Sequence, residues 1–359
     1  MHNRREHEPD PISLDPLTQA ALGASVGGLV AGRKLGLGRA LAWGAVAGTL
    51  PDIDLLANIG DDPFFNLRHH RGVTHALWFA PVVGSALGWL LWRWRRRAGP
   101  DPGWAPWVRL TSLSLLSHPL LDVFTHYGTQ LWAPFSAQRF ALPAVPAVDP
   151  AYTSILLLGL IAAWIGRQRF KQVLGVALTV STAYLGVGLA CNDHVETQVR
   201  QQLLEEGMVL DRVGVFPTFM QLPLRRVVVI GDGEVRVGFV SAWRACRVEW
   251  GPVGRVPSAA ELAALLQTEQ GRTFAWFTNR WLAVAPADGD NLRYSDLRFG
   301  FSREPAEGLW SVTLNLDPAT MPVYANQRPT LDWQTVAELF AAAFPSGCAV
   351  WRGRSPAPV

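Results

Sequence analysis

The sequence predicts an α-helical membrane bundle of about six apolar helices, the first two of them short, followed by a soluble α+β domain. Three observations support this fold class. Hydrophobic residues make up 49% of the 359 residues and charged residues only 17%, below the roughly 25% of an average soluble protein. The shortage of charge is concentrated before residue 192, and the remainder resembles an ordinary soluble domain. Short basic patches stand at the ends of the apolar runs, as they do beside membranes.

The composition divides the chain into four regions. Residues 1–14 are polar and contain proline, without the apolar core of a cleaved signal, so we expect a disordered head. Residues 15–191 are expected to form the helical membrane domain, and residues 192–350 the soluble α+β domain. Residues 351–359 are expected to be a disordered tail.

Six apolar runs define the predicted bundle. The third and sixth have the length of about 20 residues that spans a bilayer, and the fifth is slightly shorter. The fourth contains Ser, His and Asp, which insert only if they face a bundle interior. The first two are short and rich in Gly and Ala, which allows close packing and predicts a tight hairpin or a re-entrant pair. In order, the runs are Leu17–Gly32, Arg39–Leu50, Val73–Trp92, Trp107–Tyr127, Ala151–Gly166 and Gln172–Cys191.

The basic patches predict the orientation of the bundle. They are Arg33, Lys34 and Arg39, then Arg93–Arg97, then Arg167–Lys171. Because they occupy alternate loops, all three lie on one side, which the positive-inside rule makes the cytoplasm. The other loops, and everything after Cys191, are then expected to face outward, although Arg4 and Arg5 oppose this orientation. Such short basic runs, with a net charge of only +3, do not predict a nucleic-acid partner.

The second half of the chain predicts an α+β domain with a scaffolding or recognition role. It opens with the amphipathic pattern HVETQVRQQLLEE, and the turn Gly231-Asp232-Gly233 indicates a hairpin. Predicted strands are Arg226–Ile230, Glu234–Val240, Phe274–Val284 and Trp310–Leu316, and predicted helices are Ser258–Glu269 and Asp332–Ala343. Three cysteines at these spacings do not make a zinc site. Cys191 is expected to be a packed thiol, and Cys246 and Cys348 can pair only in an oxidising compartment.

Ionisable residues cluster at the outward ends of the apolar runs. The cytoplasmic loops carry basic charge and no histidine, whereas the outward ends deliver mainly Asp and His. Carboxylate oxygen and imidazole nitrogen are ligands for divalent ions, so we predict a metal centre. The outward residues are Asp15, Asp52, Asp54, His69, His70, Arg71, His75, His118, Asp122, His126 and Asp149.

Each piece of this pattern has an alternative interpretation. His118 and Asp122 lie one helical turn apart on one face, where they bind one ion or close the bundle with a hydrogen bond. Asp52 and Asp54 are paired ligands or a solvated turn, and Asp15 is a ligand or an N-cap. The predicted ligands are Asp15, Asp52, Asp54, His70, His75, His118 and Asp122, with His69 and His126 in the second shell or at the rim.

The order of these motifs resembles a known family. The stretches are Asp15-Pro-Leu-Thr-Gln-Ala-Ala-Leu-Gly, Gly48-Thr-Leu-Pro-Asp-Ile-Asp, His69-His-Arg-Gly-Val-Thr-His, His118-Pro-Leu-Leu-Asp-Val-Phe-Thr and Tyr127-Gly-Thr-Gln-Leu-Trp. Over about residues 15–190 they resemble the bacterial membrane-bound metal-dependent hydrolases, the YdjM-like (DUF457) inner-membrane proteins. The resemblance implies an inner-membrane location. It also implies a hydrolase, because the helical His-x-x-x-Asp pattern is similar to that of zinc-dependent phospholipases C.

These observations predict a metal-dependent hydrolase at the outer face of the cytoplasmic membrane. A divalent ion, zinc by preference, would activate a water against a lipid or lipid-linked phosphoester. Asp52 or Asp149 is expected to accept the proton, and Arg71 to hold a substrate anion. The alternative is a non-enzymatic membrane protein with a structural metal site or an ion or proton pathway. A metal-sensing or adhesion module ranks last, because it leaves the Asp and His cluster unexplained. The sequence makes no prediction of the oligomeric state.

Overall fold

The computed structural model describes residues 15–57, 62, 64–97, 102–219, 221–244, 246–289, 291–315, 323–326 and 333–344. The predicted head and tail lie outside these residues. The chain divides into two compact units. The helical unit comprises Met1–Ile53, Thr74–Leu121 and Ala147–Thr182, and the sheet unit comprises Asp54–Val73, Asp122–Pro146 and Ala183–Val359. The sheet unit therefore includes two loops from the part of the sequence that was predicted to be purely helical.

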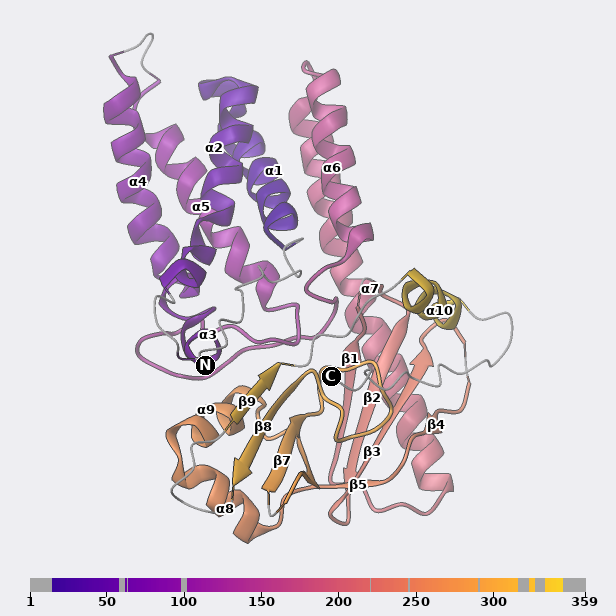
Figure 1. The fold of residues 1–359 in the computed structure, drawn as a ribbon. Coiled ribbons are helices and arrows are strands. Elements are labelled where there is room, and N and C mark those ends of the chain that lie inside the picture. Colours follow the sequence, from indigo (N-terminus) through magenta and orange to yellow (C-terminus); the bar gives the residue numbers. More distant parts are fainter. Residues whose placement is uncertain are drawn as a thin grey trace. The chain divides into compact units, whose positions relative to one another are not determined.

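The helical unit contains a helix for each predicted apolar run (Figure 1). The short 3-10 helix η1 follows the second helix, and η2 precedes α4. The last helix continues beyond this unit into the sheet unit. The bounds are α1 (Asp15–Leu35), α2 (Leu37–Thr49), η1 (Leu50–Ala57), η2 (Val73–His75), α4 (Phe79–Arg95), α5 (Ala105–Asp122), α6 (Pro150–Ile165) and α7 (Phe170–Glu205).

Among the described residues, two helices are long and apolar enough to cross a membrane: Leu37–Ala57, which joins α2 to η1, and α7. A third candidate is the pair Phe65–His75 and Phe79–Arg95, which is bent by 65°. The prediction of about six apolar spanning helices is therefore not supported. One reason is that α5 carries Arg109, His118 and Asp122. The second run also proves longer than expected, because η1 continues α2 to 21 residues.

The close α1–α2 hairpin is confirmed, and glycines make it possible. A Cβ added to Gly23 would lie 2.4 Å from the Gly44 carbonyl oxygen, and one on Gly48 would lie 2.7 Å from the Gln19 carbonyl oxygen. A Cβ added to Gly27 would likewise lie too close to the α2 backbone, 2.8 Å from the Ala40 carbonyl oxygen. Glycines four apart on each helix let the two backbones touch, as in other membrane helix pairs.

The basic helix ends lie together, as the alternate-loop pattern predicts. Arg33 and Lys34 are in the last turn of α1, and Arg93 and Arg95 are in the last turn of α4. Arg167 follows the end of α6. Figure 1 shows these three helix ends at the same end of the helical unit.

The sheet unit is built on an antiparallel nine-stranded sheet with the order β1-β2-β3-β5-β6-β7-β8-β9, and β4 pairs with β3. The predicted hairpin is confirmed: Gly231 pairs with Glu234, and Asp232 and Gly233 have φ of 51° and 78°, as a two-residue turn requires. The strands are β1 (Arg212–Pro217), β2 (Leu224–Gly231), β3 (Glu234–Ser241), β4 (Glu249–Trp250), β5 (Gly254–Arg255), β6 (Leu282–Pro286), β7 (Asn291–Asp296), β8 (Trp310–Asn315) and β9 (Val323–Asn326).

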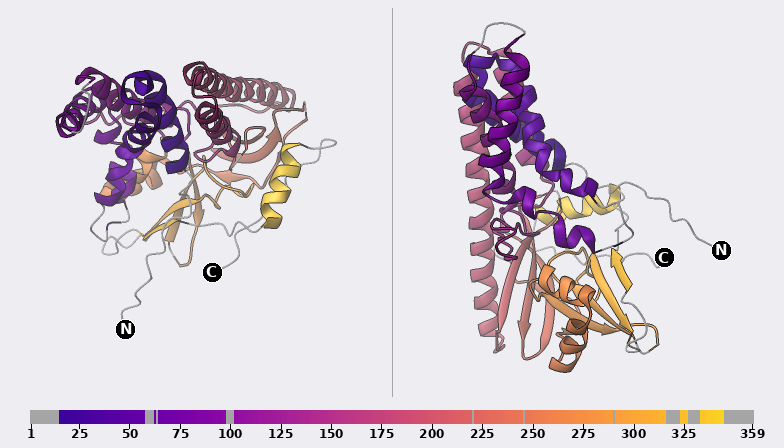
Figure 2. Two further views of the ribbon diagram at one scale, coloured as in Figure 1. Left: turned by 90° about the horizontal axis from the view of Figure 1, so that it is seen from above. Right: turned by 90° about the vertical axis from the view of Figure 1, so that its left-hand side faces the viewer.

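Helices pack on this sheet within the same unit (Figure 2). The core joins Phe64 and Leu67, beside and within α3 (Phe65–His69), to α8 (Ala259–Gln267), α9 (Glu269–Phe277) and strands β6 to β8. Ser258 and Glu261 form the capping box of α8, which confirms the predicted helix start. The second predicted helix is α10 (Trp333–Ala343), although its predicted cap, Asp332, lies outside the described residues.

One predicted strand is wrong. Residues Phe274–Phe277 belong to helix α9, and the strand β6 begins only at Leu282. The error has a physical cause, because the run is apolar and aromatic in both halves and its periodicity does not separate a buried helix from a buried strand. The Thr268 side chain, which accepts from the Gly271 amide and caps α9, is the local signal for the helix.

The long helix α7 runs through the predicted domain boundary at residues 191 and 192. Its second half belongs to the sheet unit, where Gln202 donates to the Val248 carbonyl and accepts from the Val248 amide. Cys191 on this helix is a free, buried thiol, as expected. Cys246 is disulfide-bonded, and Cys348 lies outside the described residues.

Candidate metal centre

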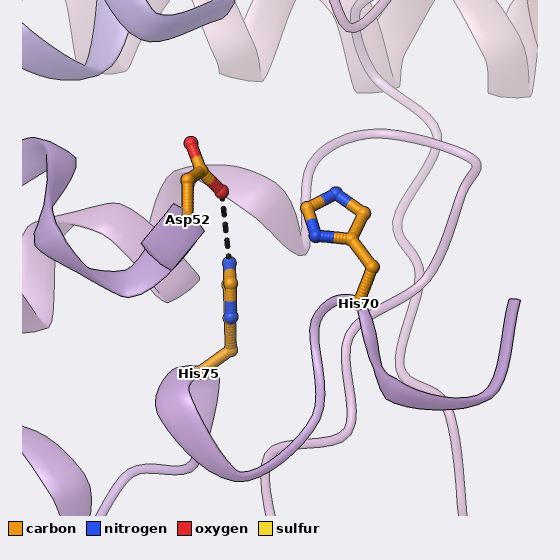
Figure 3. Close-up of side chains that lie close together, drawn as sticks. All are labelled: Asp52, His70 and His75. Carbon is orange, nitrogen blue, oxygen red and sulfur yellow. Dashed lines mark ion pairs between the residues drawn. The ribbon is translucent and has the colours of Figure 1, made fainter. Parts of the chain in front are cut away.

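Three side chains of the helical unit converge on one point. The Nε2 atoms of His75 and His118 are 3.0 Å apart. One carboxylate oxygen of Asp52, Oδ1, lies 3.4 Å from the first nitrogen and 3.3 Å from the second. Figure 3 shows Asp52 and His75 facing each other. We call Asp52, His75 and His118 the central triad.

Local structure explains this convergence. Asp52 is in η1, directly after the buried Pro51, where the chain leaves α2. His75 ends the single turn of η2 just before α4, and His118 is in the last turns of α5. These helix ends lie at the end of the helical unit opposite the arginine and lysine residues that follow or end α1, α4 and α6, because successive helices run in alternate directions. The structure thus brings these three predicted residues together at one end of the helical unit, and the side of the membrane that they face stays a prediction.

The outer nitrogens of both histidines have fixed partners. Nδ1 of His118 is 2.6 Å from the Gly48 carbonyl oxygen, and because a carbonyl only accepts, Nδ1 carries a proton. Neutral His118 then presents an unprotonated Nε2 toward Asp52 and His75. Nδ1 of His75 is 3.0 Å from the Thr74 hydroxyl. Histidines that bind metals are generally held in this way, through a hydrogen bond at the ring nitrogen that does not face the metal.

The spacing of the central triad fits a small divalent cation. In a tetrahedral zinc site with bonds of about 2.0–2.1 Å, neighbouring ligand atoms lie about 3.3–3.4 Å apart. The three observed distances, 3.0, 3.4 and 3.3 Å, are close to this edge length. Without a cation, the facing nitrogens and the carboxylate repel one another unless a proton lies between them. The donor set and its spacing therefore fit a metal ion.

Three of the seven predicted ligands, Asp52, His75 and His118, therefore come together within the helical unit, in a group that could hold a metal ion. His70, Asp54 and Asp122 belong to the sheet unit, and their role as ligands stays a prediction.

Comparison with known proteins identifies the family of the chain. A family model described as YdjM inner membrane protein matches residues 14–195, just over half of the sequence. The chain belongs to the YdjM family. Membership of this inner-membrane family, together with the candidate spans, supports a membrane localisation.

Two relatives of this YdjM-family chain extend the comparison. It is 29% identical to the uncharacterized protein YfhP of Bacillus subtilis (strain 168) over 298 residues, which cover 80% of this chain and 87% of that protein. It is 38% identical to the inner membrane protein YbcI of Escherichia coli (strain K12) over 130 residues, 35% of this chain and 71% of that protein. No solved structure matches the chain.

In this YdjM-family chain the two carboxylates of the Asp52–Asp54 pair have different partners. Asp52 belongs to the central triad. Asp54 lies 3.1 Å from Nδ1 of His70 and accepts from the Arg71 amide at 3.2 Å. The pair is therefore not a solvated turn, and its two carboxylates do not share the same partners. The arrangement is consistent with His70 being oriented by Asp54, as a carboxylate orients a metal-binding histidine.

The remaining predicted residues occupy other positions. Asp149 is buried and caps α6, accepting from the amides of Ala151 and Tyr152; its role as a base stays a prediction. Asp15 begins α1, but its side chain lies outside what the structure describes. His69 is exposed and packs on Phe65, a position compatible with the predicted rim.

His126 is buried in the sheet unit, with its ring 4.0 Å from that of Phe299. Burial lowers its pKa well below the usual value, and the nearby charges of Arg298, Arg71, Arg225 and Arg226 lower it further. An imidazole in this setting is neutral near pH 7.

Several contacts of the site were not predicted. The Gly48 carbonyl and the Thr74 hydroxyl orient the histidines, while Thr125 and Tyr127 surround Arg71. All four residues lie inside the sequence motifs that resemble the YdjM family: Gly48, Thr74, Thr125 and Tyr127. A backbone carbonyl has no residue-type signature, however, so only the position of Gly48 one turn before Asp52 could have suggested its role.

Proposed function

We propose that this chain is an integral membrane metal-dependent hydrolase acting on a lipid or lipid-linked phosphoester. The observation that carries the proposal is the central triad, in which two imidazole nitrogens and one carboxylate oxygen lie 3.0–3.4 Å apart. His70, Asp54 and Asp122 are proposed as further ligands or as groups that orient them. Zinc is the proposed ion, because imidazole and carboxylate with tetrahedral spacing suit it.

The composition of the site favours catalysis over a purely structural metal. Structural zinc sites are typically rich in cysteine and closed, whereas catalytic sites use His, Asp or Glu and keep a position open. The described groups contain only His and Asp. A cation bound there would supply Lewis acidity and an acidified water. Asp52 lies beside both imidazoles and is the proposed proton acceptor.

The location of the site supports a lipid-like substrate. The triad lies at the ends of apolar helices in a member of an inner-membrane family. A phosphoester held at the headgroup level of a bilayer would reach helix ends without leaving the membrane surface. With the basic helix ends in the cytoplasm, we propose that the site opens on the outer face and that the sheet unit is periplasmic.

Removing a triad histidine tests the proposal. We expect His75→Ala and His118→Ala to lower the zinc content of the purified protein by at least 10-fold and to abolish phosphodiester hydrolysis. Elemental analysis and release of a chromogenic phosphodiester, then of headgroups from phospholipid vesicles, measure the two effects. His194→Ala, at an exposed position of α7, is the matched control. Hydrolysis that persists in metal-free protein would overturn the proposal.

The rival function, an ion or proton pathway, makes a different prediction. A pathway needs polar groups through the whole bilayer, whereas the triad is confined to one end of the helical unit. In liposomes, the rival predicts ion or proton flux that the His75→Ala change abolishes. Our proposal predicts no such flux and an activity that depends only on added metal and substrate.

A further inference from the structure

The sheet unit exposes two aromatic side chains at one turn. Trp132 is 52% exposed, and Phe135 is 85% exposed, more than any other large apolar side chain in the part of the chain that the structure describes. Leu142, on the same loop, is also exposed. Apolar rings left in water cost free energy, and a group of exposed apolar side chains generally marks a contact site. We call residues 132–135 the aromatic turn.

Hydrogen bonds within the sheet unit hold the aromatic turn in this exposed form. The Trp132 carbonyl accepts from the amides of Phe135 and Ser136 at 2.9 and 3.1 Å. Ala133, inside the turn, is buried. Just beyond the turn, the indole nitrogen of Trp276 in α9 donates to the Ala137 carbonyl at 2.8 Å. The outward position of the two rings is therefore a property of the folded backbone.

The aromatic turn carries no charge. Residues 127–138 contain no Asp, Glu, Lys or Arg. Arg139, which follows, is directed toward the protein, because it donates to the Tyr127 and Gly128 carbonyls and lies over the Tyr127 ring at 4.8 Å. Tryptophan is enriched where a membrane meets water, since its ring suits the headgroup level, whereas the rim of a protein interface is polar. The composition of the turn therefore favours a bilayer as the surface that covers it.

The loop that bears the turn is bound to a candidate membrane segment. The Gln130 amide donates to the Arg71 carbonyl at 2.9 Å, and its side chain donates to the Arg68 carbonyl at 3.0 Å. Both acceptors lie in Phe65–His75, one half of the bent candidate span. Leu56, which belongs to the same unit and is 78% exposed, lies near the end of another candidate span. The sheet unit thus includes parts of two candidate spans, and a bilayer that holds these spans adjoins it.

We propose that the aromatic turn inserts into the headgroup region of the bilayer and anchors the sheet unit to the membrane surface. The lipid would cover Trp132 and Phe135, and no protein partner is needed. The two rings would lie at the boundary between headgroups and acyl chains, as aromatic and apolar side chains of membrane-surface segments do. The inference depends on the membrane localisation of the chain and does not depend on a metal ion or on hydrolysis.

Depth-dependent fluorescence quenching tests the inference on the full-length protein. Phe135→Cys is labelled with a polarity-sensitive fluorophore and reconstituted into vesicles of phosphatidylethanolamine and phosphatidylglycerol that contain nitroxide-labelled lipid. We expect nitroxides near the headgroup to quench the label more strongly than nitroxides at the end of the acyl chain. Protein without the added cysteine, treated in the same way, gives the background. If Phe135→Cys does not fold, Trp132→Cys carries the same label.

Two comparisons decide the outcome. The matched control is Glu234→Cys, exposed at the tip of the β2–β3 hairpin, which lies at the other end of β2 from Arg225, a donor to Ala144 of the loop that bears the turn. Lipid nitroxides should leave the control label unquenched. With the fluorophore on Trp132→Cys, adding Phe135→Asp should lower the quenching, because it places a charge in the turn. Equal quenching with and without Phe135→Asp would overturn the inference. So would a label at 135 that is quenched no more than the control, whether water or a second copy of the chain surrounds the turn.

Discussion

Individual histidines of this chain owe their properties to their neighbours. His118 is oriented by the Gly48 carbonyl and turns Nε2 toward Asp52. His126, only eight residues later, is buried among aromatic rings and arginines that lower its pKa well below the usual value. The first side chain presents a ring nitrogen to a carboxylate and a second imidazole, whereas the surroundings of the second favour its neutral form. Residue type alone does not distinguish the two.

Burial of neutral His126 predicts a pH-dependent stability. Because its pKa is lowered in the folded state, the unfolded chain binds more protons below about pH 6.5. His126 should then cost up to about 1.4 kcal/mol of stability per pH unit as the pH falls from 6.5 toward 5. His126→Leu should remove this part of the slope. Denaturation at several pH values measures it, and His194→Ala should keep the wild-type slope.

The candidate site was predictable in its residue types and less so in its partners. His and Asp at helix ends on one side were enough to single out Asp52, His75 and His118, the central triad. The different partners of the Asp52 and Asp54 carboxylates were not predictable, because they depend on the path of the backbone through η1. The engagement of Arg71 by Asp122 was also missed, since it requires a left-handed backbone that no composition signals.

The α1–α2 hairpin shows how an element sets the geometry of the site. Gly23 and Gly27 on α1 face Gly44 and Gly48 on α2 at backbone contact. Gly48 also provides the carbonyl that orients His118. The hairpin thus helps to fix the geometry of the central triad, because the packing of the two helices sets the position of the Gly48 carbonyl.

Enlarging Gly48 tests this link. A Cβ there would approach backbone atoms of Gln19 and Gly23 within 2.8 Å, so the helices must move apart. We expect Gly48→Ala to destabilise the protein by about 1–3 kcal/mol and to weaken zinc binding. Gly175→Ala in α7, where nothing lies within 4 Å, is the matched control and should be neutral or slightly stabilising. Thermal unfolding and zinc titration would show whether Gly48→Ala instead behaves like the control.

Elements with clear periodicity or turn chemistry were predicted best. The β2–β3 hairpin followed from Gly231-Asp232-Gly233, and α8 followed from its cap Ser258. The Phe274–Val284 run was misassigned because an apolar stretch satisfies both helix and strand. The number of spans was overestimated because helices such as α5 are shielded by their neighbours and need not be apolar all round.

At the scale of the whole molecule, the proposed topology is open to direct test. With the basic ends in the cytoplasm, a fusion after residue 344 should lie in the periplasm. We expect alkaline phosphatase fused there to be active, and a fusion after Arg95 at the end of α4 to be inactive. Green fluorescent protein at the same two positions should give the opposite pattern. A fluorescent fusion after residue 344 would show that the sheet unit is cytoplasmic.

The composition of the sheet unit determines which truncated forms of the protein can fold. Its described core joins Phe64 and Leu67, beside and within α3, and Tyr127, packed against them, to helices α8 and α9 and strands β6 to β8. Three separate stretches of sequence build it, and the residues between them belong to the helical unit. Truncation of the chain at any single position therefore cannot yield this unit complete and separate from the helical unit. A truncated protein starting at residue 192 would lack pieces of its own core, so we expect it to be insoluble.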